Sequence, residues 1–237
     1  MKLLITILLI DEGNPIIETL KIFNEEDNKP ESRYGSTRST LFGKFYERII
    51  SKYLEEINGY HLIRWENNQV NKPRIYWKKI NMNSYKDFND WLPKDKIIEN
   101  LDNKNSHCTP DGAFIKGNSN YIWEAKHWAL YPEKGPISQL QEYFIANPWI
   151  FADTFQIRNQ LRRIDGFLFS FWNMTKNEQK EIEQNINNII GEEKFRIILT
   201  YDILDDCRKN KYGWYTEIIE QEKWNIDLFF SELLGNE

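Results

Sequence analysis

The sequence has few of the residues on which several protein classes depend. Only two of its 237 residues are cysteines, Cys108 and Cys207, and a zinc or iron–sulfur site with four thiolates needs more. The two residues also do not form the dense cysteine framework of small secreted domains. We therefore expect a reducing, cytoplasmic location.

Long apolar runs are missing as well. Residues 3–10 are mostly apolar, but a membrane-spanning helix needs about 20 such residues. The turn-forming residues 11–15 follow them, in place of the small-residue cleavage site of a signal peptide. We therefore expect residues 3–10 to form a buried strand or helix, and we expect no contact with a membrane.

The chain also lacks an excess of positive charge. It carries 31 Lys and Arg against 36 Asp and Glu, a formal net charge of -5, which argues against a protein that coats nucleic acid by electrostatic attraction alone. The charges are unevenly spread, because residues 33–80 hold ten Lys or Arg and only four Asp or Glu. One face could therefore meet a polyanion, although an ordinary scatter of charge would give the same counts.

The hydrophobic pattern indicates an α/β fold. Hydrophobic residues make up 41% of the chain, and no repeat, low-complexity linker or domain boundary interrupts them, so we expect one domain over residues 1–237. The segment 81–106 is rich in Asn, Asp and Lys and is expected to be irregular. Apolar spacing predicts helices over 41–57, 137–146 and 177–190, and strands over 61–65, 74–80, 111–115, 121–127, 166–172 and 195–201. Alternating helices and short apolar strands favour a layered α/β domain.

Three charged residues should meet on one predicted hairpin. Glu124 and Lys126 lie two residues apart on a strand, so their side chains share a face. Residues 116–120 provide a turn, which would bring Asp111 from the open end of the hairpin beside that pair. Burying two carboxylates and an ammonium without a purpose is costly. The pattern therefore predicts a catalytic site.

Carboxylate oxygens favour a hard cation over zinc, so the expected metal is Mg²⁺. Such a site can orient a water and neutralise charge on a phosphoryl oxygen. Two neighbouring carboxylates would favour the ammonium form of Lys126, so we expect it to act by charge and position rather than as a general base.

The same residues carry a family resemblance. Pro110-Asp111, followed by Glu124-Ala125-Lys126, resembles the PD-(D/E)xK signature of the restriction-endonuclease-like nuclease superfamily. The resemblance spans residues 41–201, with the two ends as elaborations. It implies a restriction-endonuclease-like core, a central mixed β-sheet flanked by helices, and Mg²⁺-dependent hydrolysis of DNA, with Mn²⁺ as a substitute. It also implies that Asp111, Glu124 and the Ala125 carbonyl are metal ligands.

Two helices add to this resemblance. Many members of the superfamily carry a glutamate on the first core helix that points towards the metal; Glu47 matches it, although a solvated helix glutamate is the alternative. Gln139 and Tyr143 resemble the Gln-hydrophobic-x-x-Tyr motif of the RecB-like nuclease branch. Four residues apart on a helix, they would share a face and contact the catalytic hairpin or a DNA phosphate. The branch members with iron–sulfur clusters need four cysteines, which this chain lacks.

Basic residues are candidates for phosphate contacts. Lys44 lies on the polar side of the first predicted helix and Arg38 immediately precedes that helix. Both are expected to add affinity rather than specificity. Arg158 and Arg162, with the neighbouring Arg163, could clamp phosphate or form a solvated helix face. His127 should face away from Glu124 and is expected to be structural or to support a neighbouring ligand, with a direct metal ligand as the alternative.

These observations favour a type II restriction endonuclease that cuts double-stranded DNA as a homodimer, since a two-fold enzyme matches a palindromic site. The alternative with the same chemistry is a RecB-like repair, phage or defence nuclease that acts on DNA ends or single strands. A non-catalytic nucleic-acid-binding module would be expected to lack one of Asp111, Glu124 and Lys126. A glycosidase using the two carboxylates as acid and base is less compatible with the adjacent Lys126.

Overall fold

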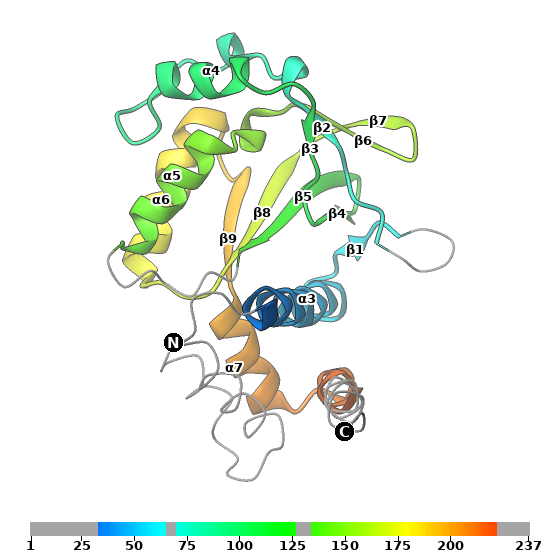
Figure 1. Ribbon diagram of the computed structural model, residues 1–237. Helices are drawn as coiled ribbons and strands as arrows, with labels where there is room; N and C mark the ends of the chain where they lie inside the picture. Colours follow the sequence, from blue (N-terminus) through cyan, green and yellow to red (C-terminus); the bar gives the residue numbers. More distant parts are fainter. Residues whose placement is uncertain (1–32, 65–69, 127–133, 222–237) are drawn as a thin grey trace. The chain divides into compact units, whose positions relative to one another are not determined.

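The structure is a computed structural model that describes residues 33–64, 70–126 and 134–221, with the side chains of residues 33–44 not described (Figure 1). The predicted element at residues 3–10 and the residue His127 lie outside this part, and so do the side chains of Arg38 and Lys44. The chain divides into two compact units, one over residues 51–200 and one formed by the segments on either side of it. The expectation of a single domain stays a prediction.

The larger unit is built on a mixed five-stranded sheet flanked by helices, which confirms the predicted α/β class. Its strands are β1 (His61–Leu62), β4 (Gly112–Lys116), β5 (Ser119–Lys126), β8 (Gly166–Phe171) and β9 (Phe195–Leu199), in the order β1-β4-β5-β8-β9. The first three strands pair antiparallel, whereas β5, β8 and β9 run parallel. The predicted hairpin is therefore present, and its second strand lies at the centre of the sheet.

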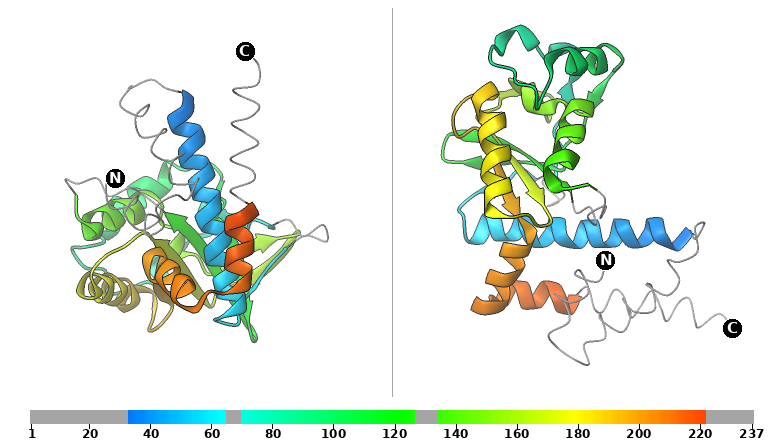
Figure 2. Two further views of the ribbon diagram at one scale, coloured as in Figure 1. Left: turned by 90° about the horizontal axis from the view of Figure 1, so that it is seen from below. Right: turned by 90° about the vertical axis from the view of Figure 1, so that its left-hand side faces the viewer.

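Helices α5 (Pro136–Ala146) and α6 (Lys176–Ile190) lie beside the sheet (Figures 1 and 2), and buried apolar side chains hold them there. The ring of Phe144 on α5 lies 5.2 Å from that of Phe169 on β8 and 5.4 Å from that of Phe195 on β9, with all three side chains fully buried. Ile182 and Ile186 of α6 belong to the same buried cluster. Burying an aromatic side chain contributes about 1.5–3 kcal/mol, so this layer fixes α5 firmly against the central strands.

Helix α6 also protects the outer edge of β9. Gln179, Glu183 and Asn187 lie four residues apart and face this strand. Gln179 donates to the Ile197 carbonyl at 3.0 Å, Glu183 accepts from the Ile197 amide at 2.7 Å, and Asn187 bonds both backbone groups of Phe195. These side chains pair backbone groups that a bare edge strand would leave open to association.

Four further strands lie beside the main sheet. They are β2 (Ile75–Tyr76), β3 (His107–Cys108), β6 (Thr154–Ile157) and β7 (Gln160–Arg163). Strand β2 pairs with β3, β6 pairs with β7, and a bridge between Arg74 and Gln156 joins the two pairs. Arg158 and Arg162 therefore lie on a β-hairpin, and the predicted alternative of a helix face is wrong. The tight turn at Arg158-Asn159, with φ of 50° and 60°, is what separates the two strands.

Several boundaries differ from the sequence prediction. Helix α3 (Arg33–Glu56) begins before residue 41. The segment 81–106, predicted to be irregular, contains a 3₁₀ turn (Met82–Ser84) and helix α4 (Lys94–Asp102). Further 3₁₀ turns lie at Trp77–Lys79 and Trp149–Phe151. After β9, helix α7 (Thr200–Asn210) begins at once, and residues 213–221 are also helical.

None of the helices among the described residues combines the length and apolar character that a membrane span requires.

Candidate active site

The β4–β5 hairpin places the two candidate carboxylates together. Gly117, with φ 59°, forms its turn, and the register sets Gly112 opposite Trp123. A Cβ atom at Gly112 would lie 2.9 Å from Leu62 Cδ1 and 3.1 Å from Trp123 Cε3. The absence of a side chain there lets β4 pack closely, and Asp111 then lies at the open end of the hairpin beside Glu124.

Hydrogen bonds fix both carboxylates to the opposite strand. Asp111 Oδ2 accepts from the Ala125 amide at 2.9 Å, and Glu124 Oε2 accepts from the Asp111 amide at 3.3 Å. Each carboxylate is therefore oriented by a backbone group beside the other. One oxygen of each carboxylate is held by these bonds, and the remaining oxygens face the surrounding side chains.

The second oxygen of Glu124 lies between a cation and a hydroxyl. Lys126 Nζ forms an ion pair with Glu124 Oε1, and the Tyr143 hydroxyl donates to the same oxygen at 2.8 Å. Trp149 Nε1 donates to the Tyr143 oxygen at 3.0 Å. The Lys126 ammonium also lies 5.6 Å from the centre of the Tyr143 ring, within the range of a cation–π contact.

Burial makes the negative charge of Glu124 unfavourable. Glu124 is 7% exposed. Burial raises the pKa of its carboxyl and the charge of Asp111 raises it further, while Lys126 and Tyr143 act in the opposite direction. Burial, followed by the charge of Glu124, raises the pKa of the Tyr143 hydroxyl, which therefore stays protonated and remains a donor. The site thus holds one carboxylate that is costly to ionise unless further positive charge arrives.

A cavity of about 290 Å³ opens at this point. Glu124 and Lys126 line it from β5 and Tyr143 lines it from α5; Cys108, Thr109, Pro110, Asn147 and Trp149 complete its wall. Burial, followed by the charge of Glu124, raises the pKa of the Cys108 thiol to about 12. Cys108 is therefore a neutral thiol near pH 7 and is unsuited to nucleophilic attack.

The oxygen donors of this site fit Mg²⁺. Among the described residues, no three or more His, Cys, Asp or Glu side chains gather closely enough to hold a metal. Mg²⁺ does not require such a group, because it is commonly held by one or two carboxylates together with waters and substrate phosphates. A divalent cation between Asp111 and Glu124 would relieve the repulsion that raises the pKa of Glu124.

The structure adds residues that the sequence analysis did not single out. Lys72 forms an ion pair with Asp111 at 3.2 Å, with half of its side chain exposed. Trp149 orients Tyr143, and Cys108 lines the cavity from β3. Lys72 is separated from Asp111 by 39 positions in the chain, so no local motif could connect the two. The alternation of basic and apolar residues at 72–75 could have indicated a strand with Lys72 on its exposed face.

The other predicted site residues are divided between the candidate site and other parts of the chain. Tyr143 contacts the hairpin as expected, but Gln139 is buried and donates to the Lys134 carbonyl at 2.8 Å. The Gln139 side-chain oxygen is buried and meets no donor among the described residues. Glu47 lies on α3 in the other compact unit. The roles predicted for Gln139 and Glu47 stay predictions, as do those of Arg38 and Lys44.

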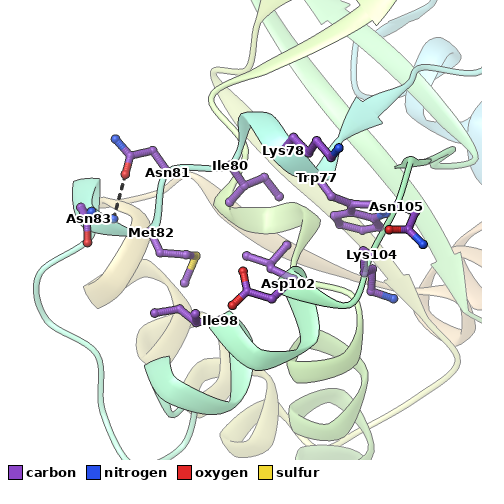
Figure 3. A pocket seen from close by; sticks show the side chains of 11 residues that line it. Trp77, Lys78, Ile80, Asn81, Met82, Asn83, Ile98, Asp102, Lys104 and Asn105 are labelled. Atoms are coloured by element: carbon purple, nitrogen blue, oxygen red, sulfur yellow. Dashed lines mark hydrogen bonds between the residues drawn. The ribbon is translucent and has the colours of Figure 1, made fainter.

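A second, larger cavity of about 550 Å³ lies between helix α4 and the 3₁₀ turns Trp77–Lys79 and Met82–Ser84 (Figure 3). Ile80, Met82, Ile98 and Asp102 are among the residues that line it, and Lys104 Nζ lies 5.3 Å from the centre of the Trp77 ring. Asp102 is its one acidic lining residue. Because paired carboxylates meet only at the smaller of these two cavities, that cavity is the candidate active site.

Comparison of the chain with models of protein families, with curated proteins and with solved structures finds no match.

Proposed function

We propose that the protein is a Mg²⁺-dependent DNA endonuclease built on a restriction-endonuclease-like core. The observation that carries this proposal is the meeting of Asp111, Glu124 and Lys126 beside one cavity, on the central hairpin of a mixed sheet. The two carboxylates are oriented by backbone amides and the ammonium is paired with one of them. The same three residues carry the PD-(D/E)xK resemblance.

A Mg²⁺ ion bound at Asp111, Glu124 and the Ala125 carbonyl would supply a water of lowered pKa and charge stabilisation for a phosphoryl oxygen. The protein residues position the reactants. Asp111 and Glu124 are held in place by the hairpin backbone, so little reorganisation is needed when substrate binds.

Lys126 contributes positive charge at the cavity wall. Its ammonium pairs with Glu124 and lies over the Tyr143 ring. A charged ammonium cannot remove a proton from water. Its role is therefore to hold the attacking water and to stabilise negative charge that develops on the phosphoryl group.

We favour a cytoplasmic, site-specific type II restriction enzyme that acts on double-stranded DNA as a homodimer. The bond from Tyr143 to Glu124 favours the RecB-like nuclease as a second candidate, because Tyr143 completes the Gln-hydrophobic-x-x-Tyr pattern on α5. The two candidates share the same chemistry and differ in the DNA that they cut.

Digestion of a sequenced circular plasmid tests this proposal. A type II enzyme should convert the plasmid, in Mg²⁺ but not in EDTA, into discrete fragments whose ends map to one sequence. A RecB-like enzyme should leave the closed circle intact and degrade linear or single-stranded DNA. A protein that cuts none of these substrates in Mg²⁺ or Mn²⁺ would contradict the proposal.

A further inference from the structure

The four short strands beside the main sheet have one inner and one outer face. Partners in antiparallel strands place their side chains on the same face. Arg74 is paired with Gln156, Gln156 with Leu161, and Thr154 with Arg163. On the other side of Arg74, Tyr76 is paired with His107. These residues therefore share the outer face of the arrangement β7-β6-β2-β3.

Burial follows the same alternation. Pro73, Ile75 and Trp77 are buried, as are Phe155 and Ile157, and they form the inner face. Lys72 and Arg74 are exposed between them. On β7, Leu161 is 59% exposed, and the Arg163 side chain is 79% exposed and lies 3.5 Å from Asp165. The core fixes the inner face, so the outer face is held rigidly and presented to solvent.

The charge on these strands has one sign. Residues 70–79 and 154–163 together contain seven Lys or Arg and no Asp or Glu, in a chain that holds 36 Asp and Glu. The segment 106–110, which includes β3, contains no Asp or Glu either. Of the seven, Lys72, Arg74 and Arg163 lie on the outer face and Arg158 at the hairpin tip, whereas Arg162 is paired with the buried Phe155. No carboxylate lies within these segments, which is the pattern expected for a polyanion site.

The tip of the β6–β7 hairpin carries an arginine in an unfavourable conformation. Arg158 has φ 50°, in the left-handed region that residues other than Gly, Asn and Asp rarely adopt. Glycine would be better suited to this two-residue turn. The exposed arginine at the tip is thus maintained at a conformational cost, which is typical of residues with a functional role.

This surface is continuous with the candidate active site. Lys72 and Arg74 form a basic row that leads from the outer face towards the hairpin. Lys72, at the end of this row, forms the ion pair with Asp111, and Cys108 on β3 lines the catalytic cavity. All of these residues belong to the compact unit 51–200. A polymer that follows the row from Arg74 to Lys72 would therefore arrive at Asp111.

We propose that the outer face of β7-β6-β2-β3 binds the DNA duplex, with the β6–β7 hairpin in the major groove and Lys72 and Arg74 on the backbone that leads to the active site. This inference rests on the proposed nuclease function and adds the surface by which substrate is held. A two-stranded β-ribbon fits the major groove. Arg158, Asn159 and Gln160, exposed at its tip, have the side chains that read base edges there.

Binding in Ca²⁺ at several salt concentrations tests the proposal without cleavage. The probe is a labelled duplex pool of mixed sequence, and the readout is fluorescence anisotropy. The double variant Arg74→Gln/Arg163→Gln should bind more weakly, and the slope of log K against log salt should fall by roughly two, about 0.9 per lost phosphate contact. The matched control is Lys96→Gln/Lys180→Gln, which removes two exposed charges from α4 and α6 and should leave the slope unchanged.

The outcomes separate this inference from the proposed function. An unchanged slope in Arg74→Gln/Arg163→Gln, or no binding of any duplex by the wild type, overturns the inference. Equal affinity for an RNA duplex also overturns it, because the narrow major groove of A-form RNA excludes a β-ribbon. If the slope falls as expected but Asp111→Asn still cleaves plasmid at the wild-type rate, the proposed function fails while the binding surface stands.

Discussion

The Tyr143 hydroxyl donates a 2.8 Å hydrogen bond to Glu124 Oε1 and accepts one of 3.0 Å from Trp149 Nε1. Through this hydroxyl, helix α5 determines where one of the two candidate metal ligands lies. Phe144, the next residue of α5, packs on Phe169 of β8, so the helix cannot shift without disturbing the core. The core of the unit thus positions the side chains of the site.

The change Tyr143→Phe tests this link. Removing the hydroxyl leaves the buried Trp149 N–H without its acceptor, which should destabilise the fold by about 1–3 kcal/mol. The loosened Glu124–Lys126 pair should lower kcat by roughly tenfold, equivalent to about 1.4 kcal/mol of transition-state stabilisation. Urea unfolding and plasmid cleavage measure the two effects. Tyr121→Phe, on the same strand as Glu124, is the control; equal effects of the two variants would show that the hydroxyl bonds have no special role.

The change Asp111→Asn should stabilise the protein in EDTA near neutral pH. The charge of Asp111 helps to raise the pKa of Glu124 in the folded state. The free energy of unfolding of the wild type therefore falls as the pH rises through that raised pKa and Glu124 ionises. The variant removes this repulsion and loses only an exposed ion pair with Lys72, which contributes little. Thermal unfolding should show a gain of roughly 2–4 °C, about 1 kcal/mol in a protein of this size.

The stability gain of Asp111→Asn over the wild type should depend on pH. Below about pH 4 Glu124 is protonated in both folded and unfolded states, so the advantage of Asp111→Asn should vanish there. Mg²⁺ should raise the melting temperature of the wild type but not of the variant. Asp87→Asn, at an exposed position, should change neither value. A variant that is less stable than the wild type in EDTA at neutral pH would show that Asp111 and Glu124 do not repel each other.

Gly112→Ala tests the close packing beside Asp111. The added methyl would lie 2.9 Å from Leu62 Cδ1 and 3.1 Å from the buried Trp123 ring, and such overpacking typically costs about 1–3 kcal/mol. Gly135→Ala is the matched control, because a Cβ there meets no atom within 4 Å among the described residues. Urea unfolding of both variants gives the comparison; a Gly112→Ala protein as stable as Gly135→Ala would show that the hairpin yields easily.

The sequence predicts the helices and strands correctly where the hydrophobic pattern is strong. The hairpin, α5, β8, α6 and β9 follow the predicted spacing because each buries a continuous apolar face. The trio Asp111, Glu124 and Lys126 could be brought together from strand alternation alone, since all three lie on one hairpin. Local sequence rules therefore predict that the three central residues of the candidate site lie together.

The remaining features depend on contacts between distant parts of the chain. Strands β6 and β7 have four residues each, and their turn places Arg158 in a conformation that sequence rules assign to glycine or asparagine. Helix α4 is short and lies in a polar segment, with Ile97 as its buried contact. The ion pair of Lys72 and Asp111 exists only because β2 and β3 pair, which no local pattern specifies.

The most direct test of the catalytic account is the rate of plasmid cleavage in Mg²⁺ by the wild type, Asp111→Asn and Lys126→Ala. Loss of one well-placed electrostatic group should lower the rate by ~100- to 1000-fold, while Asp87→Asn and Lys180→Ala should cut like the wild type. Ca²⁺, with its looser coordination, should support DNA binding without cleavage. Cleavage that persists in EDTA, or an Asp111→Asn protein with near wild-type activity, would contradict the account.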